Sequence, residues 1–113
     1  MTGTHEEASI LARLMRWHLD QCDGEWEHEY GVRISTMDNP GWSVSIDLAY
    51  TGVPPEAIAP RTEHRSEHDW IECSVQPGCV SSGDGEGHSK FVGYGGPRNL
   101  EEMIEYFLRC AGA

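Results

Sequence analysis

The sequence is poor in positive charge. It has 8 Lys and Arg residues against 19 Asp and Glu residues, which gives a formal net charge of −11 over 113 residues. Nucleic acid is therefore a poor partner, because its phosphates would be repelled and no run of Lys and Arg is present to replace their counterions. A basic protein would instead be attracted. The alternative is that acidity only maintains solubility.

Long apolar runs and ordered cysteine spacings are also missing. No window approaches the roughly 20 apolar residues of a membrane span, and the opening MTGTHEEASI has neither the basic nor the apolar region of a signal peptide. The four cysteines, Cys22, Cys73, Cys79 and Cys110, are too few and too irregularly spaced for a disulfide scaffold. We therefore expect a cytoplasmic protein with reduced cysteines and no membrane partner.

Signatures of metal and phosphate sites are weak. His64 and His68 are four residues apart, as are His18 and Cys22, but neither pair has two further ligands nearby. The glycine-rich run over residues 81–87 lacks the Gly-Lys-Ser/Thr of a phosphate-binding loop. We therefore predict no metal ligand and no cofactor.

Paired carboxylates suggest one alternative function. A small metal-binding protein or an enzyme would use the cluster over residues 23–28, where Glu25 and Glu27 stand two apart as acid and base or as metal ligands. The competing interpretation is a solvated surface, because perturbed carboxylates normally lie in partly desolvated clefts. We favour the solvated surface and predict no catalytic residue.

Hydrophobic periodicity predicts the element order α-β-β-β-β-α. The expected elements are a helix over residues 6–21, strands over 26–36, 42–50, 69–75 and 90–94, and a final helix that begins after Asn99, with Asn99 as its N-cap. Residues 51–68 hold three prolines and no periodicity, so they are predicted to be a connection. The simplest packing is a single α+β domain over residues 1–113. It has two layers, a four-stranded antiparallel meander with the N- and C-terminal helices on one face.

The first two strands form a predicted hairpin. Their apolar sets share a face only if the loop has an odd number of residues. A loop over residues 39–41 would place Ile34 opposite Ile46. Pro40 disfavours the helical region at Asn39, so a five-residue loop is the alternative. The turn and the inward-facing aromatic side chains define the residues expected to be structural, which are Trp17, Gly24, Trp26, His28, Pro40, Gly41 and Trp42.

The sheet face that the helices leave uncovered is the predicted protein-binding surface. Alternation from Trp26 would turn Trp26 and His28 inward and would set three glutamates outward in a row. Trp70, exposed beside carboxylates, is a candidate binding hot spot. The predicted contacts of a basic protein partner are Asp23, Glu25, Glu27, Glu29, Asp47, Trp70 and Glu72.

Two composite motifs carry a resemblance. Residues 21–28 read QCDGEWEH and residues 38–42 read DNPGW, with Gly31 between them. Together with residues 11–17 and 93–100, they resemble the bacterial immunity protein 53 family. The resemblance implies a cytoplasmic antitoxin of a polymorphic toxin system, encoded near its toxin, that binds and blocks the toxin without chemistry of its own. Many such toxins are nucleases with basic grooves, which agrees with the acidity of the chain. An interaction module unrelated to toxins is a further alternative.

Overall fold

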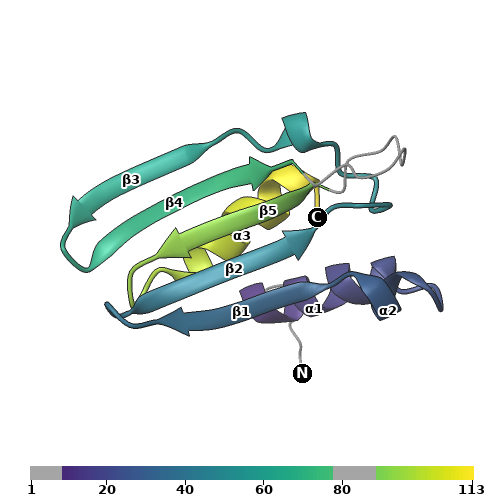
Figure 1. Cartoon of the computed structure of the whole chain (residues 1–113), viewed down its shortest axis with the longest axis horizontal. Coiled ribbons are helices and arrows are strands. Elements are labelled where there is room, and N and C mark those ends of the chain that lie inside the picture. Colours follow the sequence, from purple (N-terminus) through teal and green to yellow (C-terminus); the bar gives the residue numbers. More distant parts are fainter. Residues whose placement is uncertain (1–8, 78–88) are drawn as a thin grey trace, which may run out of the picture.

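The structure is a computed structural model that describes residues 9–77 and 89–113. The elements in chain order are α1 (Ile10–Gln21), α2 (Trp26–Glu29), β1 (Val32–Met37), β2 (Gly41–Asp47), the 3-10 turn η1 (Pro55–Ala57), β3 (Arg61–Ser66), β4 (Asp69–Gln76), β5 (Lys90–Gly95) and α3 (Leu100–Ala111). Figure 1 shows the strands as one twisted sheet with α3 across its back and with α1 and α2 beside β1.

The sheet has five antiparallel strands in the order β1-β2-β5-β4-β3. The predicted α+β class with a helix at each end is confirmed, but the four-stranded meander is wrong. The last strand, β5, is inserted between β2 and β4. Phe91, Val92, Gly93 and Gly95 of β5 are all buried, and so apolar a strand is most stable in the centre of a sheet, where a neighbouring strand shields each of its edges.

β3 is the strand that the sequence did not predict. Its residues read RTEHRS, without one apolar side chain, and they lie in the segment that we expected to be a connection. The strand is fixed by pairing with β4 and by contacts with α3. Arg61 Nη2 lies 3.4 Å from a Glu102 oxygen, and Arg65 Nη2 lies 2.7 Å from the other. Because an edge strand tolerates polar side chains on both faces, periodicity does not reveal it.

The hairpin of β1 and β2 has the predicted odd loop. Val32 pairs with Ile46 and Met37 with Gly41, so the loop consists of residues 38–40 and includes Pro40. The predicted pairing of Ile34 with Ile46 is wrong by two residues, because Ile34 lies opposite Val44. A shift of two preserves the faces of the strands, so the apolar side chains of both still share the helix side.

The core lies between the sheet and the helices. Its fully buried side chains are Val44, Ile46, Ile71, Phe91, Met103, Phe107 and Leu108. Trp17 of α1 packs edge-on against Phe107, with ring centroids 5.0 Å apart, and joins α1 to α3. Trp42 also packs on this core as predicted, and its Nε1 donates to Pro97 O at 3.1 Å.

Asn99 precedes α3 as predicted, but its side chain does not cap the helix. Asn99 is only 5% exposed. Its Oδ1 accepts a hydrogen bond from Trp70 N at 3.3 Å, and its Nδ2 donates to Asp69 Oδ1 and to Glu102 Oε1, both at 3.0 Å. A buried amide with this many partners ties the start of α3 to the start of β4.

The apolar stripe of α1 is only partly buried. Within α1, Leu14 and Trp17 are buried, while Leu11, Met15 and Leu19 are 56%, 62% and 69% exposed. The helix begins at Ile10, after the N-cap Ser9, whose Oγ accepts from Ala12 N at 3.0 Å. The earlier part of the predicted helix, residues 6–8, lies outside the described residues.

Gly41 is expected to resist substitution because β2 and β5 approach closely there. A Cβ at Gly41 would lie 2.4 Å from Gly95 O, a backbone atom, so Gly41→Ala should lower the free energy of unfolding by about 1–3 kcal/mol. Gly31→Ala is the matched control, since nothing lies within 4 Å of its Cβ position. Urea denaturation of both variants measures the difference, and equal stabilities would contradict the close approach.

Candidate functional site

The acidic segment over residues 23–29 is a helical turn, so the first part of the strand predicted over residues 26–36 is wrong, and the strand begins only at Val32. Asp23 Oδ1 accepts hydrogen bonds from Glu25 N at 3.0 Å and Trp26 N at 2.9 Å. Glu27 reaches back and accepts from Asp23 N at 3.0 Å and Gly24 N at 2.9 Å. This reciprocal capping outweighs the alternating pattern that predicted a strand. Glu25, Glu27 and Glu29 consequently do not form a row on the sheet.

Two of the predicted contacts therefore stabilise local structure. Hydrogen bonds from the backbone N–H groups of Trp26 and Glu25 lower the pKa of Asp23. Backbone N–H groups, those of Glu27 itself, Asp23 and Gly24, likewise lower the pKa of Glu27. Each carboxylate is held in its charged form by the turn that it caps. Gly24 has φ +96°, as expected of a glycine after the first helix, but α1 ends earlier, at Gln21, with Cys22 as an extended C-cap, so Gly24 is not its left-handed stop.

Trp26 anchors α2 to the rest of the molecule, as predicted. It is 4% exposed, and its Nε1 donates to Ala49 O at 2.8 Å. Its ring lies 6.3 Å from that of Trp17, edge-on. The inward orientation predicted for His28 is wrong, because His28 is exposed. Each residue of a helix is rotated by about 100° from the one before it, so His28, two residues after Trp26, lies about 200° around the helix and points away from the core.

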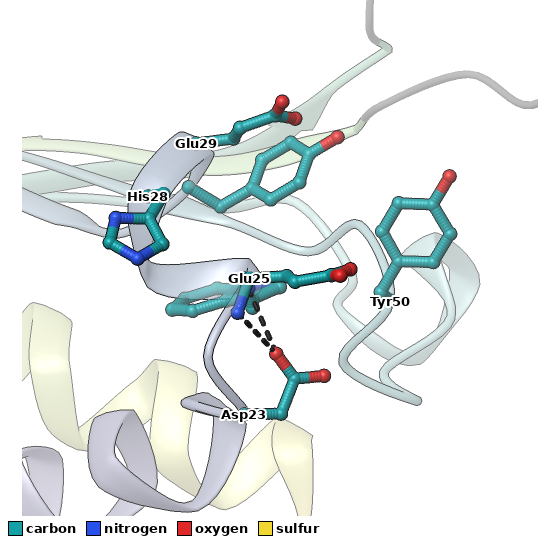
Figure 2. A pocket seen from close by; sticks show the side chains of 7 residues that line it. Asp23, Glu25, His28, Glu29 and Tyr50 are labelled. Carbon is teal, nitrogen blue, oxygen red and sulfur yellow. Dashed lines mark hydrogen bonds between the residues drawn. The ribbon is translucent and has the colours of Figure 1, made fainter.

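A cleft of about 540 Å³ lies beside α2. Figure 2 shows it from close by, with the Glu25 side chain extended toward Tyr50. The residues that line the cleft are Asp23, Glu25, Trp26, His28, Glu29, Tyr30 and Tyr50. The rings of Tyr30 and Tyr50 lie 6.0 Å apart. Carboxylates beside aromatic rings suit a guanidinium or ammonium group, which gains ion pairing and cation–π attraction together.

The two tyrosines were missed as site residues. The alternation of β2 placed Tyr50 on the inner face with Trp42, but β2 ends at Asp47 and a turn follows. Tyr50 is 74% exposed and has φ +61°. A bulky residue rarely adopts the left-handed region. Thr51 and Gly52, which follow it, were the signal for a turn at this position.

The predicted contacts on the sheet lie elsewhere. Trp70 and Glu72 do stand on the open face, the side of the sheet away from α1 and α3, because their neighbours Ile71 and Cys73 are buried on the other side. Trp70 is half-buried and stacks on His64, whose Nε2 lies 3.0 Å from a Glu72 oxygen. Figure 1 places the start of β4 at the opposite end of the sheet from α2, so the seven contacts do not form one surface.

Asp47 holds the end of the hairpin together. Its Oδ2 accepts from Gly31 N at 2.9 Å and lies 3.3 Å from Arg33 Nη1, and its side chain is only 13% exposed. Arg33 and Lys90 share the open face with Asp47, since they alternate with inward-facing residues. The open face thus carries both signs of charge. The strongest local concentration of acid is at α2.

Metal-ligand geometry is absent from the described ranges, 9–77 and 89–113, where no group of three or more His, Cys, Asp or Glu residues could hold an ion. His18 and Cys22 are joined by a hydrogen bond of 3.3 Å from Cys22 Sγ to His18 O. Cys79 and the glycine-rich run over residues 81–87 lie outside the described residues. Among the described helices, none is long and apolar enough to cross a membrane.

Comparison with protein-family models matches residues 11–112 to immunity protein 53. The chain belongs to the immunity protein 53 family. The match runs from the first turn of α1 to the end of α3 and includes the whole sheet. No curated protein and no solved structure matched the chain significantly. Membership in an immunity-protein family implies a toxin partner, and it suggests a binding role rather than an enzymatic one.

Glu27→Gln is expected to destabilise the protein in a pH-dependent way. Because the folded-state pKa of Glu27 lies below its ordinary value of 4.5, the carboxylate stabilises the fold above that value and loses this effect as the pH falls through the folded-state pKa. Wild type and variant should therefore differ most near pH 7 and converge in acid. Urea denaturation from pH 7 to pH 3 measures this. Glu29→Gln, outside the capping contacts, is the control, and a difference independent of pH would contradict the capping role.

Proposed function

We propose that this protein neutralises a cognate bacterial toxin by binding it in the cytoplasm, without catalysis. The observation that carries the proposal is the family match over residues 11–112. The cleft beside α2 supports a binding role, because it presents carboxylates and tyrosines, which suit a cationic protein surface, and no set of metal ligands lies within the described chain.

The proposed contact surface is the acidic end, which we define as Asp23, Glu25, Glu29, Tyr30 and Tyr50. Glu25 and Glu29 are exposed and lie on the two sides of Trp26 along α2. The hydrogen bond from the buried indole of Trp26 to Ala49 O fixes α2 beside the turn that carries Tyr50. Binding there costs little backbone ordering, because the backbone is already fixed.

The proposed toxin is basic at the contact. A net charge of −11 steers a cationic surface toward the molecule. A nuclease with a basic substrate groove fits this description, since carboxylates at the acidic end would stand where phosphates bind. Trp70 and Glu72 form a separate candidate contact on the open face. Asp47 and Glu27 act through the structure that they hold.

Reversal of charge at the acidic end should weaken toxin binding. Glu25→Lys combined with Glu29→Lys removes two attractive charges and adds two repulsive ones, so association should slow by roughly tenfold or more at low salt. The measurements are survival of cells that co-express the toxin and association kinetics at two salt concentrations. The fold should persist, because the side chain of Glu25, the N-cap residue, makes no capping hydrogen bond and Glu29 is exposed at the end of α2.

The matched control is Glu101→Lys combined with Glu105→Lys on α3, which makes the same change of charge on an exposed helix. Trp70→Ala with Glu72→Ala tests the open face separately. If the α2 variant protects cells fully and associates at the wild-type rate, the acidic end is not the contact surface.

A further inference from the structure

The helix layer does not close beneath β1. α3 packs across the centre of the sheet, and Trp17 holds α1 against α3. The helix-side residues of β1, Val32, Ile34 and Thr36, all remain at least partly exposed, and Ile34 is 37% exposed. One strand of the sheet therefore has an apolar side without a complete cover.

α1 presents a second apolar stripe toward this opening. Leu11, Met15 and Leu19 follow one another at intervals of four residues and are more than half exposed, so they form one ridge of the helix. Between this ridge and β1 lies a groove of about 650 Å³. It is lined by Leu14, Met15, Arg16, His18, Leu19 and Val32. An exposed apolar surface of this kind typically marks an interaction site.

The backbone of β1 offers hydrogen bonds at the same place. Asp47 N donates to Gly31 O at 3.1 Å, and these two residues lie directly opposite each other in the register. In an antiparallel pair such bonded positions alternate. Residues 33, 35 and 37 therefore bond to β2, and the N–H and C=O groups of Val32, Ile34 and Thr36 point away from β2. In the described part of the chain, β1 is the last strand of the sheet on this side.

The two edges of the sheet differ in protection. β3, at the other edge, carries Arg61, Glu63 and Arg65 and has an irregular register between His64 and Ser66. Charges and bulges of this kind discourage further pairing. β1 reads VRISTM, its register is continuous, and it contains no proline or lysine. The unprotected edge is the one beside the apolar groove.

Charge decides which occupant fits this edge. Arg16 lines the groove and no Asp or Glu does, so the groove carries positive charge in a chain of net charge −11. Arg33, on the open side of β1, is already paired with Asp47. A second copy would bring its own Arg16 toward this one in a symmetric contact and would add its own net charge. A segment with apolar and acidic side chains meets no such repulsion.

We infer that β1 and the groove receive an extended segment of the toxin, which pairs with β1 as an additional strand. Its apolar side chains cover Met15, Leu19 and Ile34, and a carboxylate of the segment lies near Arg16. Main-chain pairing supplies affinity in this mode of recognition, and the side-chain groove supplies specificity. The inference rests on the proposed toxin binding and adds a second contact to the acidic end.

Thr36→Pro tests the pairing directly. Proline removes an N–H that points away from β2, so an edge strand tolerates it while the ladder to β2 remains. Affinity for the inactivated toxin encoded beside this gene, measured by calorimetry, should fall by roughly tenfold or more. Thr36→Ala keeps the N–H and should bind like the wild type. Circular dichroism and urea denaturation verify that each variant is folded.

Met15→Gln combined with Leu19→Gln tests the groove without changing the backbone or the charge, since both side chains are exposed in the free protein. It should also lose about tenfold or more in affinity, whereas Glu101→Gln with Glu105→Gln, which likewise places two glutamines on an exposed helix face, should not. Wild-type affinity in either folded test variant would show that the inference is wrong.

Two further results separate this inference from the proposed function. If the charge reversal at Glu25 and Glu29 abolishes binding while Thr36→Pro and the groove variant bind normally, the proposed function stands and the strand addition is wrong. A concentration-dependent dimer of the free chain in sedimentation, lost in Thr36→Pro, would assign the edge to a second copy and would also overturn the inference. If the wild-type chain does not bind the toxin, both proposals are wrong.

Discussion

The close approach of α3 to the centre of the sheet is the constraint on which the rest of the structure depends. A Cβ at Gly93 would lie 2.9 Å from Met103 Sδ, and one at Gly95 would lie 3.0 Å from Met103 Cε. Because these two glycines have no side chain, α3 packs closely against β5. β5 must then be central, with β2 and β4 beside it, and β1 and β3 become the edges. A single helix cannot cover five strands, so the cover of β1 depends on α1.

Apolar periodicity predicted the helices and strands whose side chains form the core. The final helix and the strands that correspond to β2, β4 and β5 were predicted, since the apolar spacing within each element reflects its own burial. The order of the strands was not, because it depends on the fit of Met103 over two glycines distant in sequence. β3 was missed for a related reason. β3 is stabilised by pairing with β4 and by an ion pair with Glu102. Neither interaction requires apolar residues at alternating positions of the strand.

The candidate site, too, was predicted only in part from the sequence. The sequence located the acids correctly but assigned them to one strand face, because capping by Asp23 and Glu27 competes with alternation over the same residues. Capping folds α2 around Trp26, and the bond from Trp26 to Ala49 O sets Glu25 close to Tyr50. Asp23 and Glu27 thus stabilise the turn on which Glu25 and Glu29 are exposed. The aromatic part of the cleft comes from a turn that strand periodicity could not place.

The charge of the chain has a second consequence at the unprotected edge. An exposed apolar groove beside a regular edge strand ordinarily invites self-association. At −11, two copies repel each other at long range, and Arg16 opposes a symmetric pairing at short range. No carboxylate lines the groove, so the acidic residues of the chain lie outside it. The charge distribution therefore opposes self-association through this edge, and it agrees with the proposal that a different protein occupies it.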